Sequence, residues 1–237
     1  MNDELKNLLE GLRSGIKDME LSQSLAYLSE LFPGKVTLSS SFSWEDQVLS
    51  HFVLDAKLDV EIFTLDTGRL FPETYTVWSR TNERYQTRIK AYYPNNQSIE
   101  SYIAAKGPNA FYNSVTERKE CCFIRKVEPL RRALKNKSIW ITGLRAEHSP
   151  ERQDLEILEW DEANSIIKYN PLLHTTTDEL KKIIRDNSIP YNPLHDKGFV
   201  SIGCAPCTRA IRPGEDFRAG RWWWEENTKK ECGLHAR

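Results

Sequence analysis

Five cysteines are the most reactive residues in this sequence, and four of them form two pairs. Cys204 and Cys207 are spaced as Cys-x-x-Cys, whereas Cys121 and Cys122 are adjacent and stand far earlier in the chain. Cys232, close to the C-terminus, has no such neighbour. Two distant pairs predict that two chain segments bind one metal centre through thiolates, while the fifth thiol remains for chemistry.

Other uses of these cysteines are open at this point. Disulfides suit an oxidising compartment, but the acidic start of the chain, with no apolar segment after it, is unlike a secretory signal peptide. Structural zinc usually takes two Cys-x-x-Cys knuckles, and an adjacent pair makes a poor knuckle because neighbouring side chains diverge. A thioredoxin-like pair needs a strand and then a helix, which the residues around Cys204 do not predict. An iron–sulfur cluster accommodates the adjacent pair better, because its irons occupy separate corners.

Composition is that of an ordinary globular enzyme. The chain has 237 residues, a net charge of −1 and 28% charged residues, so nothing indicates general attraction to nucleic acid or to a membrane surface. No apolar run approaches the length of a membrane span. We therefore expect one sizeable cytoplasmic domain, or one with a small appendage, with no nucleic-acid partner and no membrane partner.

Strands and helices alternate in the predicted secondary structure. Apolar residues at helical spacing indicate two helices within residues 4–31. Strands are expected at 35–40, 60–65, 89–93 and 138–142, helices from about 44, over 72–87, 117–135 and 177–187 (the last capped by Thr177), and short strands within 155–169. Repeated strand–helix units are typical of an α/β fold with a doubly wound, mostly parallel sheet. Cys121 and Cys122 then lie on a helix.

Polar residues follow the ends of the predicted strands, which is where open α/β sheets bind ligands. Ser41 and Ser43 stand between the first strand and a helix that begins near Trp44. Free backbone N–H groups form an anion site at such a helix N-terminus, although serines that only cap the helix fit the same pattern. Leu65 ends the second strand, before a further polar turn.

The loop after the fourth strand carries two arginines. Gly143 begins the turn, and Arg145 and Arg152 flank the polar residues that follow. Paired hydrogen bonds from these guanidinium groups would bind phosphate or sulfate. Solvation at the protein surface is the alternative explanation for both arginines.

Arginines and tryptophans dominate the stretch before the last cysteine. Arg218 and Arg221 precede three tryptophans at 222–224, which are expected to pack and anchor the tail. The polar residues 229–237 around Cys232 include lysines and a histidine, which favour the thiolate form of that cysteine.

Taken together, these motifs resemble the assimilatory adenylyl-sulfate reductases of bacteria. The matching segments are Cys121-Cys122, Cys204-Ala205-Pro206-Cys207, Glu231-Cys232-Gly233-Leu234-His235, residues 41–49, Leu65-Asp66-Thr67-Gly68 and residues 218–224. The resemblance implies an adenine nucleotide alpha hydrolase-like (ATP-pyrophosphatase-like) α/β fold. It also implies reduction of adenosine 5′-phosphosulfate to sulfite and AMP, with thioredoxin as the electron donor.

The resemblance also assigns roles to residues. Cys121, Cys122, Cys204 and Cys207 would bind a [4Fe-4S] cluster. Cys232 would be the nucleophile, forming an S-sulfocysteine from which thioredoxin, or a glutaredoxin-like dithiol, releases sulfite. The residues expected to bind substrate are Ser41, Ser43, Leu65, Lys126, Gly143, Arg145, Arg218, Arg221 and His235. The expected division is N-terminal helices at 1–34, a nucleotide-binding domain with the cluster ligands at 35–217, and a catalytic tail at 218–237.

Three alternatives stay open. Reduction of 3′-phosphoadenylyl sulfate, or of both nucleotides, is the nearest, although cluster-free reductases of that substrate lack the four ligand cysteines. Enzymes of tRNA sulfur modification on a related fold carry a Ser-Gly-Gly-x-Asp-Ser loop, which residues 41–46 do not match. A zinc-stapled binding module without catalysis is the third. The oligomeric state is open, with a homo-oligomer among the outcomes.

Overall fold

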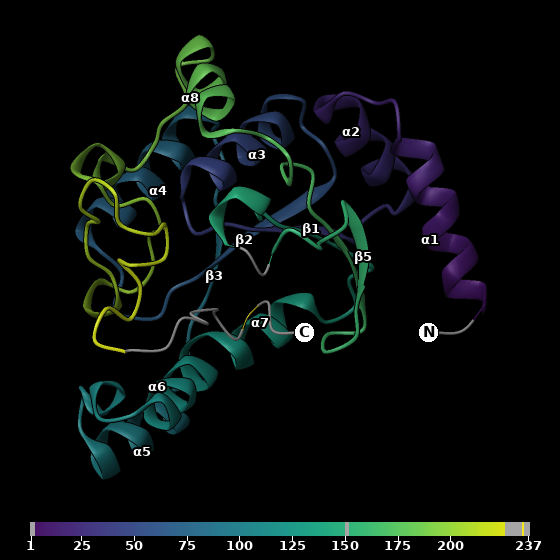
Figure 1. Cartoon of the computed structure of the whole chain (residues 1–237). Helices are drawn as coiled ribbons and strands as arrows, with labels where there is room; N and C mark the ends of the chain where they lie inside the picture. Colours follow the sequence, from purple (N-terminus) through teal and green to yellow (C-terminus); the bar gives the residue numbers. More distant parts are fainter. Residues whose placement is uncertain (1–2, 150–151, 226–233, 235–237) are drawn as a thin grey trace.

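The structure is a computed structural model, and it describes residues 3–149, 152–225 and 234. The strands in this part of the chain are β1 (Val36–Ser39), β2 (Val60–Leu65), β3 (Lys90–Tyr92), β4 (Ile139–Ile141), β5 (Leu158–Asp161) and β6 (Ile166–Tyr169). They form one sheet in the order β3-β2-β1-β4-β6-β5 (Figure 1). Neighbouring strands are parallel except β5, which pairs with β6 as an antiparallel edge hairpin. The predicted α/β class and mostly parallel sheet are confirmed.

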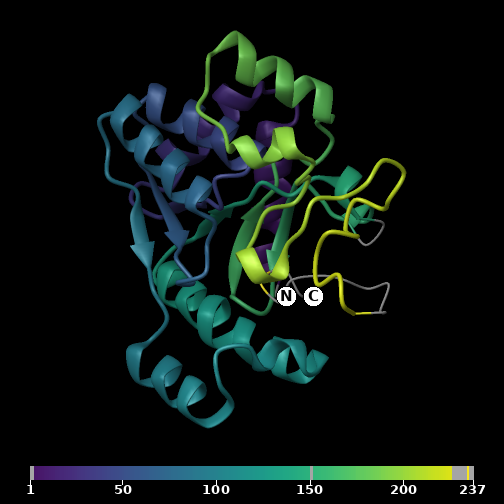
Figure 2. The ribbon, with the colours of Figure 1, turned by 90° about the vertical axis from the view of Figure 1, so that its left-hand side faces the viewer.

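Helices cover both faces of the sheet. They are α1 (Asp3–Ile16), α2 (Leu21–Leu31), α3 (Trp44–Asp55), α4 (Pro72–Arg84), α5 (Asn96–Lys106), α6 (Val115–Cys122), α7 (Glu128–Leu134) and α8 (Thr177–Asp186). In Figures 1 and 2, α2, α3, α4 and α8 lie on one face, and α7, continued by α6, lies on the other. Helix α5 was not predicted, and the N-cap of α8 is Thr176 rather than Thr177.

Alternation along the central strands explains the two layers. On β4, Ile139 and Ile141 pack with the helices of the α3 face, whereas Trp140 between them packs with Leu130 and Ala133 of α7. Successive side chains of a strand point to opposite faces, so a fully apolar strand is buried on both sides. The carboxyl ends of β1, β2 and β4 are therefore held at one rigid edge.

The predicted helix at 117–135 is interrupted. A π-helical turn, Phe123–Val127, separates α6 from α7. Such turns are rare and occur frequently at functional sites. This one directly follows Cys121 and Cys122 and contains Lys126, so it sets the direction in which these side chains point.

The segment after α8 contains only short helical turns among its described residues and folds back beside the sheet edge (Figure 2). Thr208 and Arg221 form an isolated antiparallel bridge, and Trp222 N donates to the carbonyl of Cys207 at 3.1 Å. The Cys-x-x-Cys loop and the tryptophan run are thereby tied together.

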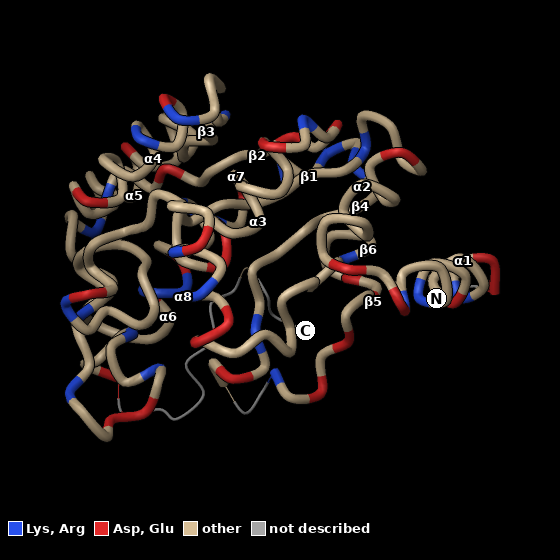
Figure 3. Tube along the Cα trace, turned by 90° about the horizontal axis from the view of Figure 1, so that it is seen from above, with Lys and Arg blue, Asp and Glu red and all other residues tan. Residues whose placement is uncertain are grey.

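Charges of both signs are interspersed along the trace (Figure 3). Among the described residues, no helix combines the length and the apolar character that a bilayer crossing requires.

Candidate functional site

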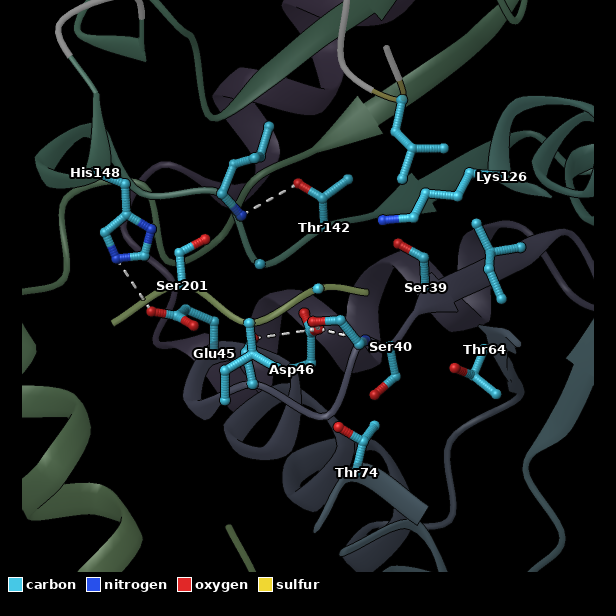
Figure 4. Close-up of a pocket in the computed structure, with 18 of the residues that line it drawn as sticks. Ser39, Ser40, Glu45, Asp46, Thr64, Thr74, Lys126, Thr142, His148 and Ser201 are labelled. Atoms are coloured by element: carbon cyan, nitrogen blue, oxygen red, sulfur yellow. Dashed lines mark hydrogen bonds and ion pairs between the residues drawn. The ribbon is translucent and has the colours of Figure 1, made fainter. Parts of the chain in front are cut away.

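A cleft lies at the carboxyl ends of β1, β2 and β4 (Figure 4). It contains about 1170 Å³ of space between atoms, with open solvent at its mouth included. Most of the residues that the sequence predicts to bind substrate line it: Ser41, Ser43, Leu65, Lys126, Gly143, Arg218 and Arg221. Side chains from distant parts of the chain thus converge at the sheet edge, as parallel topology requires.

The loop between β1 and α3 is organised by a buried carboxylate, Asp46. Ser41 donates to Asp46 Oδ2 from its backbone N and from its hydroxyl, both at 2.6 Å, and the Ser43 hydroxyl donates at 3.3 Å. Burial raises the pKa of Asp46 to about 6, although the bonds from Ser41 oppose the shift. Asp46 lines the cleft and was not among the predicted site residues.

Gly143 is required where β4 meets this loop. A Cβ at this position would lie 2.5 Å from Asp46 Oδ1 and 2.8 Å from Glu45 Cβ. Only glycine therefore lets the turn after β4 approach the first turn of α3, and its backbone stays open to the cleft.

Arg145 does not line the cleft, in contrast to the expectation for a substrate-binding residue. Its side chain is 1% exposed, and its Nε donates to Glu45 Oε1 at 2.9 Å. The remaining guanidinium nitrogens bind Glu147, His148, the Thr177 hydroxyl and the Thr175 carbonyl. Arg145 lies behind the cleft wall because a buried carboxylate of α3 faces it. Arg152 lines the cleft instead.

His148 connects Glu45 to the segment that carries Arg218. Its Nε2 lies 3.3 Å from Glu45 Oε1, and its ring stacks on Phe217 at a centroid distance of 4.0 Å. Burial alone would raise the pKa of Glu45, but the hydrogen bond and charge of His148 and the charge of Arg145 hold it well below its usual value. This part of the cleft wall is therefore an electrostatically coupled unit.

A second cavity brings the two cysteine pairs together. Cys121, Cys122, Cys204 and Cys207 all line it. Its other lining residues are Pro206 and a set of cationic or aromatic side chains: Arg69, Phe111, Arg118, Arg125, Lys126, Arg221 and Trp222. In the described part of the chain, no three His, Cys, Asp or Glu side chains are close enough to hold a single metal ion. The four thiols thus share one space without converging on one point.

The two thiol-bearing segments are held in place by backbone contacts. Ala205 N donates to the carbonyl of Arg69 at 2.8 Å, and the Thr67 hydroxyl lies 3.2 Å from Cys204 Sγ. Burial, and after it the neighbouring Cys204, raises the pKa of Cys207 to about 12. Cys207 is therefore a neutral thiol at pH 7 unless a bound cation displaces its proton.

Lys126 and Arg221 belong to both spaces, lining the cleft and the cysteine cavity alike. Arg218 and Arg221 each donate to the Ser201 hydroxyl, at 3.4 and 3.3 Å. Ser201 lines the cleft and was not predicted as a site residue. The buried Nε of Arg221 has no hydrogen-bond partner among the described residues.

Cys232 and His235 lie outside the described residues. Leu234, which is described, lines the cleft.

The chain is similar to known proteins over most of its length. Residues 35–210 match the phosphoadenosine phosphosulfate reductase domain. The adenosine 5′-phosphosulfate reductase of Allochromatium vinosum is 50% identical over 202 residues, covering 85% of this chain and 79% of that protein. The corresponding protein of Sinorhizobium fredii strain USDA 257 is 45% identical over 227 residues, covering 96% and 90%.

One solved structure supports the same relationship, and another shares only the fold. Phosphoadenylyl-sulfate reductase from Candida auris, in a phosphate complex, superposes with a TM-score of 0.74 at 26% identity, covering 89% of this chain and 98% of that one. An FMN adenylyltransferase from Candida glabrata, at 15% identity and a TM-score of 0.53, shares the fold alone. The domain match spans the sheet, the cleft loops and all four paired cysteines, and the chain belongs to the phosphoadenosine phosphosulfate reductase family.

Proposed function

We propose that this protein reduces adenosine 5′-phosphosulfate to sulfite and AMP. The observation that carries the proposal is the cleft itself, which Lys126, Arg218 and Arg221 line beside a cavity lined by four cysteines. Relatives that are 45% to 50% identical to the chain carry the name of this activity.

The two ends of such a substrate would contact different parts of the cleft. Leu65 and Gly143 would meet the nucleoside through their backbones at the sheet edge. Lys126, Arg218 and Arg221 would face the phosphosulfate, because charge-assisted hydrogen bonds from cations bind phosphate and sulfate oxygens most strongly. As AMP leaves, the same cations would stabilise the charge that develops on its phosphate.

Cys232 is proposed as the nucleophile, and it stands two residues before Leu234 of the cleft. Its thiolate attacks the sulfur atom, the bond from sulfur to the bridging oxygen breaks, and AMP leaves with that electron pair. The product is an S-sulfonated Cys232. A thiolate of thioredoxin, or of a glutaredoxin-like dithiol, then attacks the Cys232 sulfur and expels sulfite. The second thiol of the donor resolves the mixed disulfide, so the donor supplies both electrons. His235 is proposed to face the phosphosulfate.

The donor set supports a [4Fe-4S] cluster held by Cys121, Cys122, Cys204 and Cys207. Four soft thiolates in one cavity suit iron–sulfur ligation, and cationic side chains line the same cavity. When bound, the cluster would supply a fixed negative centre beside Lys126 and Arg221. Because thiols carry the two-electron chemistry, we assign it a structural and electrostatic role.

Reduction of 3′-phosphoadenylyl sulfate is the second candidate, and the similarity to the Candida auris reductase favours it. Initial rates with both nucleotides, measured in parallel with thioredoxin and a reductant, separate the two. We expect a far higher kcat/KM with the unphosphorylated nucleotide, and no turnover by Cys232→Ser. A preference for the 3′-phosphorylated substrate would establish the second candidate, and no sulfite from either would overturn both. We further propose a cytoplasmic location.

A further inference from the structure

Trp222 lines the cysteine cavity beside Arg221, and its backbone has a conformation that bulky residues rarely adopt. Its side chain is 1% exposed, and its φ angle is +42°. Left-handed backbone is unfavourable for a residue with a large side chain and persists only where the surroundings enforce it. Here the surroundings include the Cys207 carbonyl, which accepts the Trp222 N–H at 3.1 Å.

Three guanidinium groups surround the Trp222 indole. The Cζ atoms of Arg118, Arg221 and Arg218 lie 4.4, 4.9 and 5.6 Å from its ring centroid. All three distances are within the range in which a cation is attracted to the face of an indole ring. Arg118 comes from α6, and its ion pair with Glu225 is buried on both sides.

Arg221 is confined by Gly203 as well as by the indole. A Cβ at Gly203 would lie 2.5 Å from Arg221 Nη2 and 2.8 Å from its Cζ. The guanidinium therefore packs directly on the backbone of residue 203 while its Nη1 donates to Ser201. A long, flexible side chain is thereby held in one of its many rotamers before any ligand binds.

We propose that Trp222 is a positioning residue: its indole face holds Arg221 and Arg218 toward the cleft and so sets the affinity for the anionic part of the ligand. The proposal rests on the proposed function, since the ligand is taken to be an adenine nucleotide. Without the aromatic face, several like charges in one buried region would repel each other and spread among other rotamers. Pre-organisation of this kind raises affinity by removing the cost of ordering the side chains upon binding.

The adjacent tryptophan provides a matched control. Trp223 is 49% exposed, and its ring packs edge-on against Trp224, with no guanidinium over it among the described residues. The same substitution one residue further along therefore removes an indole without touching the guanidinium groups of the cleft.

The test compares AMP with adenosine, which lacks the phosphate. Trp222→Leu, Trp222→Phe and Trp223→Leu are purified anaerobically, their iron content is measured, and both ligands are titrated by calorimetry. We expect Trp222→Leu to bind AMP about tenfold more weakly, with the affinity for adenosine unchanged. Trp222→Phe should stay within about threefold of wild type because a phenyl ring keeps an aromatic face, and Trp223→Leu should match wild type.

Gly203→Ala tests the position of Arg221 without altering the indole, and unchanged AMP affinity in this variant would overturn the proposal even if Trp222→Leu fails to fold or to retain iron. The new methyl group should displace Arg221 and weaken AMP binding while sparing adenosine. Unchanged AMP affinity in the folded variants, or an equal loss for AMP and adenosine, would overturn the proposal. Wild-type protein that binds neither ligand would instead contradict the proposed function.

Discussion

Replacing Arg145 by methionine should destabilise the fold while leaving nucleotide affinity almost unchanged. Arg145 and Glu45 form an ion pair with side chains that are 1% and 6% exposed. Methionine removes the cation but keeps a side chain of similar length, so Glu45 is left buried with His148 alone and without the permanently charged partner. Breaking a buried pair in this way costs about 3–5 kcal/mol of unfolding free energy.

Because His148 remains beside Glu45, we expect the loss of unfolding free energy to lie at the lower end of this range, about 3 kcal/mol. Its Nε2 is already 3.3 Å from Glu45 Oε1, and burial, with a smaller contribution from the charge of Arg145, keeps the pKa of His148 below its usual value. With Arg145 gone, His148 takes up a proton more readily and partly replaces the lost charge. The destabilisation should therefore be smaller at pH 6 than at pH 8.

Urea unfolding and AMP titration on the same preparations provide the assay. Adding Glu45→Gln to Arg145→Met should restore part of the stability, because no uncompensated charge is then buried. Arg132→Met, at an exposed ion pair with Glu128, is the control and should cost at most about 1 kcal/mol. A tenfold loss of AMP affinity with unchanged stability would refute this reasoning and would show that Arg145 binds the nucleotide.

Three further predictions concern the cleft and the cysteines. Asp46→Asn should remove a pH dependence: because the pKa of Asp46 is raised from 3.8 to about 6 on folding, its contribution to stability is complete below pH 3.8 and is lost as the pH rises through 6. Between pH 5 and 7.5, wild type should lose about 1.4 kcal/mol more unfolding free energy than the Asn variant, and parallel pH curves from urea unfolding would contradict this. Cys204→Ser should lose the visible absorbance and the iron of the anaerobically purified protein, which Cys232→Ser should keep; full iron in the first variant would remove Cys204 from the ligand set. Arg221→Ala should weaken AMP binding by about 1.5–3 kcal/mol, whereas Arg212→Ala, at an exposed site, should bind AMP like wild type; equal affinities in calorimetry would exclude Arg221 from anion binding.

The edge of the sheet was predictable from the sequence because it depends on backbone periodicity. Apolar runs bounded by polar turns define β1, β2 and β4, and parallel pairing then places Ser41, Leu65 and Gly143 together whatever their side chains do. The convergence of the cysteine pairs was predictable from thiolate chemistry. Here the structure adds the shared cavity.

Pairings between distant side chains were not predictable in this way. Nothing in the residues near Arg145 indicates that Glu45 would be buried opposite it, so a free guanidinium at a strand end was the simpler expectation. Asp46 was missed because an acidic residue in the first turn of a helix ordinarily only complements the helix dipole. Helix α5 was missed because its pattern of polar and apolar residues is weak, and its N-terminus depends on one local bond from Ser98 N to Asn95 Oδ1.

Intact-mass analysis after a single turnover tests the central claim most directly. Protein mixed with adenosine 5′-phosphosulfate, without any thiol, should release one AMP and gain one sulfonate per chain. Peptide mapping should place the sulfonate on Cys232, and added thioredoxin should release it as sulfite. An unmodified chain with intact substrate, or a sulfonate on any other cysteine, would contradict the account.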